Sequence, residues 1–406
     1  MTTGTADAPI GAAVAPGPEV MARAHAVARA GRFPALDGLR ALAVLSVMAT
    51  HVGFQTGENF RGTIGALLSR GDVGVTIFFL LSGFLLYTPF VRGHLAGGPV
   101  PATKTFLRNR ALRILPAYWV VLAVVLPTLD RSVSDLPKVV THVLLLQVYP
   151  RGHLVGGLTQ TWSLAVEASF YLILPLLALL VAPARRHVRT PHEQLKVEAV
   201  LLAAMVTISL AWTVIVRHDV VDQHVGPLWL PQYLDWFALG MGFAVLRSWH
   251  DRSGRGLVLD QLGDAGGSCW IVAALLFWLT TTPLGGPRGL DPPTTWEAVI
   301  KHLLYGLAAG ALLVPALFGT DDTSFVRRLL TSRPARHLGR ISYGIFLWHL
   351  IALDLVFRLT PLNPFTGHAL LVAALVFPLS VAMAELSLRV VEQPALNWKR
   401  SALPPC

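Results

Sequence analysis

Apolar runs of about 20 residues recur along this 406-residue chain, and they constrain its fold more than any other feature. About 20 helical residues cross the hydrocarbon core of a bilayer, so each run is a candidate transmembrane helix. Hydrophobic residues make up 53% of the chain and charged residues only 14%, where about a quarter is usual. The short alternating segments typical of a transmembrane β-barrel do not occur in the sequence. We therefore predict an all-α polytopic integral membrane protein.

The hydropathy pattern predicts ten transmembrane helices. Residues 1–33, rich in Ala, Gly and Pro, are expected to form a disordered cytoplasmic tail, and residues 399–406 a second, short one. The transmembrane domain then covers residues 34–398. A further apolar run, 138–149, is too short to cross and predicts a re-entrant or interfacial helix. The ten expected spans are 37–56, 72–91, 112–129, 161–182, 195–216, 229–246, 266–284, 296–318, 338–357 and 367–390.

The distribution of positive charge predicts the topology. The net charge is +10, and with the N-terminus inside, 24 of the 33 Lys and Arg residues lie in inner segments. This bias places both termini in the cytoplasm of a plasma-membrane protein. The charges lie between the apolar runs and form no long basic run, so we expect no nucleic-acid partner. The nine outer ones are Arg61, Arg70, Arg131, Lys138, Arg151, Arg217, Arg288, Lys301 and Arg358.

Two cysteines, Cys269 and Cys406, give no disulfide framework and no CxxC motif, and we expect no metal.

Ionisable side chains inside spans are costly and usually face a cavity or a partner, so they are the first candidates for functional residues. Those in or at the ends of the expected spans are Arg40, His51, Glu167, Asp235, His349, Asp354 and Glu385.

His51 is the leading candidate for a catalytic base. It follows Arg40 by eleven positions, which corresponds to about 16 Å along a helix. Arg40 would lie near the cytoplasmic boundary and His51 well inside the membrane. An imidazole there can take a proton from a hydroxyl near neutral pH. The alternative is a buried histidine that only bonds a neighbouring helix.

Glu167 and His349 are the next candidates. A glutamate inside an apolar span needs a partner or a water-filled pocket, so Glu167 could orient a histidine, bind acceptor hydroxyls or form a structural pair. His349, in the segment 347–349 (LWH), is a rival base. The segment 78–84 (FFLLSGF) contains Ser82 and Gly83, small residues that also allow close helix packing.

Arg110 and Arg113 open the third expected span and lie on the same face of a helix. A pair of guanidinium groups at a membrane boundary could bind phosphates with paired donors. The alternative is that both side chains anchor the helix to lipid headgroups.

Six sequence blocks, taken together and in this order, resemble the acyltransferase 3 family of membrane acyltransferases. The resemblance extends from residue 33 to about residue 398. The blocks are 36–40 (LDGLR) with His51, 78–83 (FFLLSG), 110–116 (RALRILP), 162–167 (WSLAVE), 342–349 (SYGIFLWH) and 392–394 (EQP). A narrower resemblance links the chain to actinobacterial members that acylate macrolides.

The resemblance implies transfer of an acyl group from cytoplasmic acyl-CoA, acetyl-CoA or propionyl-CoA, to a hydroxyl of a carbohydrate, glycolipid or macrolide. In the family an arginine precedes the essential histidine by eleven positions, as Arg40 precedes His51. The expected partners are thus the bilayer, acyl-CoA and a hydroxyl-bearing glycan or macrolide, with a homodimer as a further possibility. The resulting assignments are His51 and Glu167 to catalysis, Arg40, Ser82, Arg110, Arg113 and Tyr118 to the donor, and Asp37, Trp162 and His349 to the acceptor.

A transporter is the alternative from another class, since ten spans with scattered buried charges fit one too. The sequence contains no obvious inverted repeat of the kind that many carriers show. A membrane scaffold without chemistry is a third reading. Dependence on acyl-CoA separates the enzyme from both.

Overall fold

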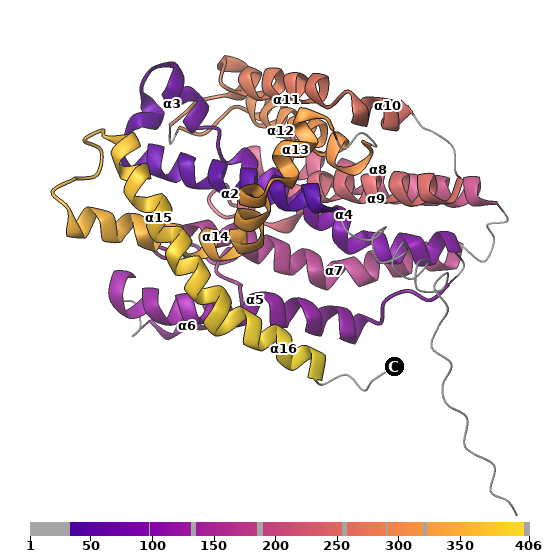
Figure 1. Cartoon of the computed structure of the whole chain (residues 1–406), viewed down its shortest axis with the longest axis horizontal. Coiled ribbons are helices and arrows are strands. Elements are labelled where there is room, and N and C mark those ends of the chain that lie inside the picture. Colours follow the sequence, from indigo (N-terminus) through magenta and orange to yellow (C-terminus); the bar gives the residue numbers. More distant parts are fainter. Residues whose placement is uncertain are drawn as a thin grey trace, which may run out of the picture.

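The computed structural model describes residues 33–96, 98–130, 135–184, 190–253, 258–289, 291–319 and 323–401, and it contains only helices and loops there. Figure 1 shows long helices bundled side by side, with shorter ones at their ends. The expected tail, apart from Phe33, and residues 402–406 lie outside the described residues. The long helices are α2 (Pro34–Gln55), α4 (Val73–Ala96), α5 (Thr103–Val125), α7 (Trp162–Ala184), α8 (Pro191–Arg217), α9 (Leu234–Ser253), α11 (Gly266–Thr280), α12 (Thr295–Leu317), α14 (Arg333–Leu359) and α15 (Ala369–Ser387).

Short helices connect or flank the long ones. They are α3 (Gly62–Leu68), α6 (Leu136–Val143), α10 (Val258–Asp264), α13 (Phe325–Thr331) and α16 (Gln393–Ser401), with single turns at η1 (Glu58–Phe60), η4 (Thr159–Thr161), η5 (Gly226–Leu228), η6 (Leu230–Tyr233) and η7 (Pro283–Gly285). Two π-helical turns, η2 (Leu126–Asp130) and η8 (Leu388–Glu392), extend α5 and α15. The prediction of an all-helical polytopic membrane protein is confirmed within the described residues.

The number of spanning helices differs from the expected ten. Eight described helices are long and apolar enough to cross a membrane, and the count reaches nine if α10 and α11, bent by 84°, form one span. The missing one is α9, which covers much of the expected span 229–246. It carries Asp235, Arg247, Asp251 and Arg252 within 20 residues, too many charges for its length. Its middle is nevertheless buried in the bundle, where Phe237 and Met241 are fully covered.

The run 138–149 forms a short helix rather than a span. α6 has eight residues, about 12 Å of helix, and cannot cross a bilayer. Its apolar side chains Leu136, Val140 and Val143 are exposed at helical spacing, as in an interfacial helix. Two side chains of α5 bind its C-terminal end: Tyr118 donates to the His142 carbonyl at 2.9 Å, and Trp119 to that of Val143.

Burial divides the bundle into inner and outer helices. In α14 and in the segment that holds α4, 72% of the most apolar stretch is buried, against 22% in α8 and α15. Small residues permit the close inner packing. A Cβ added to Gly83 of α4 would lie 2.3 Å from the Phe237 oxygen of α9, and one on Gly339 of α14 would lie 1.9 Å from the Asp37 oxygen of α2. These contacts join α4 to α9 and α14 to α2, and a Cβ on Gly74 of α4 would lie 2.3 Å from the Ala43 oxygen of α2. The site described next lies among these helices.

Helix starts agree with local sequence signals. Thr190 and Glu193 form a capping box at α8, and Thr294 and Glu297 form one at α12. Ser332 caps α14 by accepting from the Ala335 amide, and a proline occupies the first turn of that helix. The first residue of α14 is therefore defined by its local sequence.

Candidate active site

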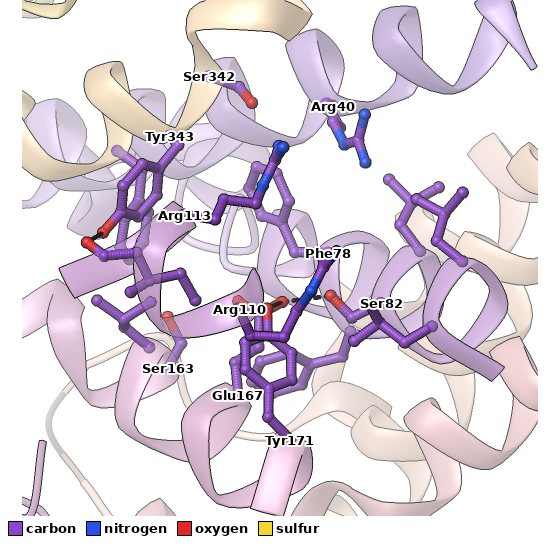
Figure 2. A pocket seen from close by; sticks show the side chains of 17 residues that line it. Arg40, Phe78, Ser82, Arg110, Arg113, Ser163, Glu167, Tyr171, Ser342 and Tyr343 are labelled. Atoms are coloured by element: carbon purple, nitrogen blue, oxygen red, sulfur yellow. Dashed lines mark hydrogen bonds between the residues drawn. The ribbon is translucent and has the colours of Figure 1, made fainter. Parts of the chain in front are cut away.

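Two cavities lie among the inner helices. The first, of about 380 Å³, is called the arginine cavity here (Figure 2). Its polar lining residues are Arg40, Ser82, Arg110, Arg113, Ser163, Glu167, Tyr171, Ser342 and Tyr343. The second, of about 240 Å³, is called the histidine cavity. It is lined by Val47, Thr50, His51, Phe54, Asn59, Ser69, Asp72, Val75, Gln160, Trp162, Arg288, Gly289 and Phe346.

The two cavities follow one another along the same helices. α2 contributes Arg40 to the arginine cavity and His51, three turns further on, to the histidine cavity. α4 and α7 contribute Ser82 and Glu167 to the arginine cavity, and the turns that precede them contribute Asp72 and Gln160 to the histidine cavity. Phe346 of α14 lines both cavities, so its side chain lies between them. Its ring packs edge-on against Phe78, with 6.5 Å between ring centroids.

Three guanidinium groups give the arginine cavity its charge. Arg40 is paired with Asp37 at 2.9 Å, on the first turns of α2. Arg110 and Arg113 come from α5 and are three residues apart, which directs both toward the same cavity (Figure 2). The Arg110 Nε is buried and has no hydrogen-bond partner within the part of the chain that the structure describes. An excess of positive charge with unused donors suits an anionic ligand.

Glu167 lies in the arginine cavity and is held by hydroxyl groups. Ser82 of α4 and Tyr171 of α7 both donate to its Oε1, the latter at 2.7 Å. Arg110 lies close by in Figure 2. Glu167 does not line the histidine cavity, and its carboxylate is hydrogen-bonded to Ser82 and Tyr171 rather than to His51.

His51 is hydrogen-bonded to the second candidate histidine. The His349 Nδ1 lies 2.8 Å from the Phe346 carbonyl oxygen and 3.1 Å from that of Ile345, so it must carry a proton. Its Nε2 is then an acceptor in the neutral ring. The His51 Nδ1 lies 2.8 Å from the Val47 oxygen and 3.2 Å from that acceptor. Because both partners accept, His51 carries its proton on Nδ1.

This arrangement leaves the His51 Nε2 as an unprotonated acceptor in the neutral ring. No residue that the structure describes bonds this nitrogen, and His51 lines the histidine cavity. His349, 1% exposed, lies behind it and lines neither cavity. The geometry is that of a base oriented by a second group.

Gln160 connects this pair to the start of α7. Its Nε2 donates to the Leu347 carbonyl at 3.1 Å and to that of Phe346 at 3.4 Å. The side chain is 2% exposed and lines the histidine cavity, and its Oε1 has no partner among the described residues. Gln160 therefore braces the turn of α14 that precedes His349.

The structure separates the remaining predicted site residues. Ser82 lines the arginine cavity, and Trp162 lines the histidine cavity. Asp37 contacts Arg40, while Tyr118 lies outside both cavities, where it donates to the His142 carbonyl. Three other ionisable residues pair elsewhere. Asp235 pairs with His302, Asp354 with Arg358 and Glu385 with His337.

Several cavity residues were missed by sequence reasoning. Asp72 lines the histidine cavity from the turn that precedes α4, and a charged residue heading an apolar run was the signal. Tyr171 carried no distinguishing signal, since aromatic residues are common in apolar runs, and Gln160 lies just before the expected span 161–182. Phe346 lies within the block 342–349 but was not singled out. Within the described ranges no group of three or more His, Cys, Asp and Glu could hold a metal ion.

Comparison with known proteins points to one family. A family model described as an acyltransferase domain, that of acyltransferase 3, matches residues 33–385. The chain belongs to the acyltransferase 3 family. The matched residues, 33–385, include every residue that lines the two cavities.

Two relatives illustrate what this acyltransferase 3 member is similar to. The peptidoglycan O-acetyltransferase OatA of Listeria monocytogenes is 25% identical over 389 residues, which are 89% of this chain and 55% of the relative. The acyltransferase MdmB of Streptomyces mycarofaciens is 33% identical over 174 residues, 39% of this chain and 43% of the relative. The chain thus spans little more than half the length of the first relative. No solved structure matches it.

Proposed function

We propose that this protein is a membrane O-acyltransferase that moves an acetyl or other short acyl group from acyl-CoA to a hydroxyl of a carbohydrate, glycolipid or macrolide. The observation that carries the proposal is the orientation of His51, with its Nδ1–H held by Val47 and His349 and its Nε2 left for a substrate. Membership of the family and its O-acetyltransferase relative support the reaction class.

The arginine cavity is the proposed donor site. The phosphates of acyl-CoA would bind the guanidinium groups of Arg40, Arg110 and Arg113, with the buried Arg110 Nε as one unused donor. We propose a positive-inside topology with both termini in the cytoplasm, and this cavity would then lie on the cytoplasmic side of the plasma membrane. The long, thin pantetheine arm would carry the thioester along α2 toward His51.

The histidine cavity is the proposed site of chemistry. The His51 Nε2 takes the proton of the acceptor hydroxyl, and the oxygen attacks the thioester carbonyl carbon. The new C–O bond forms, the C–S bond breaks, and the leaving CoA thiolate takes the proton from the His51 Nε2 to become the free thiol. The imidazolium formed on His51 directs its Nδ1–H at the lone pair of the His349 Nε2, which stabilises the charge.

The test is acceptor-dependent release of CoA thiol by the purified protein, with acetyl-CoA and propionyl-CoA and panels of macrolides and glycans. His51→Ala should lower turnover by about 100- to 10,000-fold, the usual contribution of a positioned base. His224→Ala is the matched control, because His224 is 68% exposed in a loop and lines neither cavity. Full turnover in a folded His51→Ala protein would contradict the assignment.

Donor binding is tested on α5. Arg110→Ala should raise the KM for acyl-CoA by roughly tenfold, the loss expected for one charge-assisted contact, while Arg108→Ala should not. Arg108 is exposed on the same helix and lines neither cavity. A folded protein that binds no acyl-CoA would instead favour the transporter alternative.

A further inference from the structure

The histidine cavity contains a carboxylate that the proposed transfer does not use. Asp72 lines this cavity together with His51, and its side chain is 44% exposed. We propose that Asp72 binds a second hydroxyl of the acceptor, adjacent to the one that His51 deprotonates. The acceptor class is then a diol, as on a sugar ring, rather than an isolated alcohol. This inference rests on the proposed function, since it names what the same site recognises.

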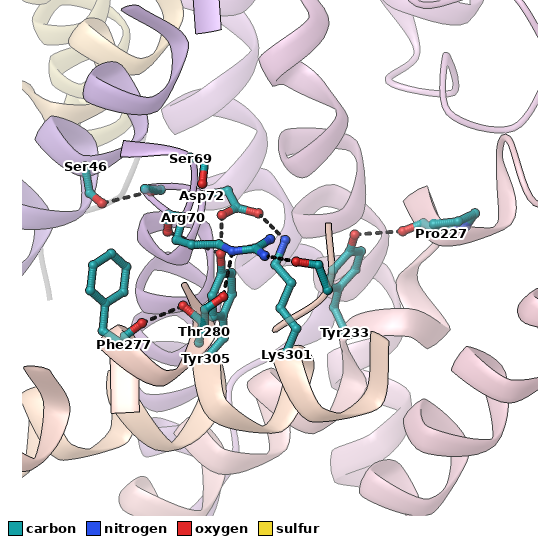
Figure 3. A network of polar contacts seen from close by, with 12 residues as sticks. Ser46, Ser69, Arg70, Asp72, Pro227, Tyr233, Phe277, Thr280, Lys301 and Tyr305 are labelled. Carbon is teal, nitrogen blue, oxygen red and sulfur yellow. Dashed lines mark hydrogen bonds and ion pairs between the residues drawn. The ribbon is translucent and has the colours of Figure 1, made fainter. Parts of the chain in front are cut away.

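The Asp72 carboxylate is held in a fixed position (Figure 3). Tyr305 donates its hydroxyl to Asp72 Oδ1, and Lys301 donates to Oδ2 at 3.1 Å. Both partners come from α12, and the Lys301 ammonium lies 5.1 Å from the centroid of the Tyr305 ring. A carboxylate oriented by two neighbours loses little freedom when it binds a further group.

The backbone that carries Asp72 is equally constrained. Arg70 is 3% exposed, and its guanidinium donates to the Thr280 carbonyl at 2.8 Å and to that of Gly286 at 2.6 Å. Tyr305 also donates to the Arg70 carbonyl at 3.2 Å. The turn before α4 is therefore tied to the last residue of α11 and to the loop that follows it, and Asp72 lies in this fixed turn.

The carboxylate retains capacity for a ligand. Each oxygen of an ionised carboxylate has two lone pairs, and Tyr305 and Lys301 use one on each oxygen. The side chain is 44% exposed and lines the cavity, so a ligand in the cavity can reach it. The other charged side chain of the lining, Arg288, donates to the carbonyls of Gly62 and Thr281, so its charge is directed at backbone.

The remaining lining fits a molecule rich in hydroxyl donors. The His51 Nε2 accepts, and the buried Gln160 Oε1 has no partner among the residues described. The rings of Phe54, Trp162 and Phe346 supply apolar surface. Acceptors combined with aromatic faces complement a sugar-like ring, whose hydroxyls donate at its rim and whose C–H groups pack on its faces.

The test separates binding from turnover. Affinities of cis-1,2-cyclohexanediol and cyclohexanol for the full-length purified protein are measured by competition NMR without donor, then acetyl transfer to both is measured with acetyl-CoA. The wild-type protein should bind the diol about 10- to 100-fold more tightly, as expected for a hydrogen bond to a charged group. Asp72→Asn should reduce this preference to less than about threefold while affecting cyclohexanol little.

Tyr305→Phe is the matched control, because it removes a partner of the same carboxylate and leaves the carboxylate itself; the diol preference should persist. Asp72→Ser serves the same purpose as Asp72→Asn if the latter does not fold. Equal binding of the two alcohols by the wild-type protein, or an unchanged preference in the Asp72 variant, overturns the inference. Because binding is measured without donor, an absence of CoA release would count against the proposed function alone.

Discussion

At the residue scale, the central feature is the contact between two histidines on different helices. His51 and His349 are 298 positions apart, and their nitrogens lie 3.2 Å from each other. The carbonyl partners of each ring determine which nitrogen carries the proton, and the result is a single orientation for the proposed base, His51. His349 is thus suited to act through His51, as a positioning residue.

A substitution at His349 tests this role. His349→Ala should lower kcat by about 10- to 100-fold, because the imidazolium of His51 loses its acceptor, while the KM for acyl-CoA stays within about twofold. His349→Gln places a carbonyl oxygen near the same point and should recover part of kcat. Steady-state kinetics of the three proteins provide the measurement. A rise in the acceptor KM alone would instead support direct substrate binding by His349.

At the scale of elements, α14 connects the two cavities. It carries Ser342 and Tyr343 on the arginine side, Phe346 between the cavities and His349 behind His51. Tyr343 donates to the Ile114 carbonyl at 2.7 Å, which joins α14 to α5. One helix thereby sets the distance between the proposed donor site and the proposed base.

Phe346 should control which acyl groups reach His51. Replacing it with alanine joins the two cavities, so a longer acyl chain can occupy the space of the ring. The ratio of kcat/KM for hexanoyl-CoA to that for acetyl-CoA should rise about tenfold or more in Phe346→Ala. Phe325→Ala is the control, since Phe325 is 71% exposed on α13. An unchanged chain-length profile would show that Phe346 does not select the acyl group.

The contact between α4 and α9 predicts a stability effect. A methyl group on Gly83 would meet the backbone oxygen of Phe237, which cannot move away as a side chain can. Gly83→Ala should therefore destabilise the protein by about 1–3 kcal/mol, as overpacking of an interior usually does. Gly267→Ala is the matched control, because nothing lies within 4 Å of its added Cβ in α11. Thermal unfolding in detergent micelles distinguishes the two variants, and equal melting temperatures would contradict the packing argument.

At the scale of the whole molecule, the charge distribution and the order of the two cavities along the helices suggest a direction for the proposed acyl transfer. The proposed donor cavity lies toward the end of the bundle where the predicted inner positive charges gather, and the histidine cavity lies further along the same helices. Transfer would then carry an acyl group away from the cytoplasmic side.

Labelling at the two ends of α8 tests this topology. In a background without Cys269 and Cys406, His224→Cys should react with a membrane-impermeant maleimide in intact cells. His192→Cys, exposed at the other end, should react only after permeabilisation. The reason is that α8 is long and apolar enough to separate the two positions by a bilayer. Labelling of both positions in intact cells would overturn the predicted orientation.

Much of the architecture was accessible from the sequence because membrane helices must bury their own backbone hydrogen bonds and expose apolar side chains to lipid. Because of that requirement, each span appears in the sequence as a run of about 20 apolar residues. The span prediction differs from the structure at α9, where Asp235 is hydrogen-bonded to His302 inside the bundle. Intramembrane charge likewise pointed to His51 and Glu167, since such groups are retained only where they have a cavity or a partner.

The pairing of residues within the site was decided only by the tertiary structure. The ionisable residues in spans carried the same signal in the sequence, yet Asp235 pairs with His302 of α12 while Glu167 lines a cavity. The sequence determined which helices exist, because hydropathy and caps act over neighbouring positions. The close contact of α2 with α14 and the register of their side chains determined that His51 meets His349, because such contacts join residues far apart along the chain.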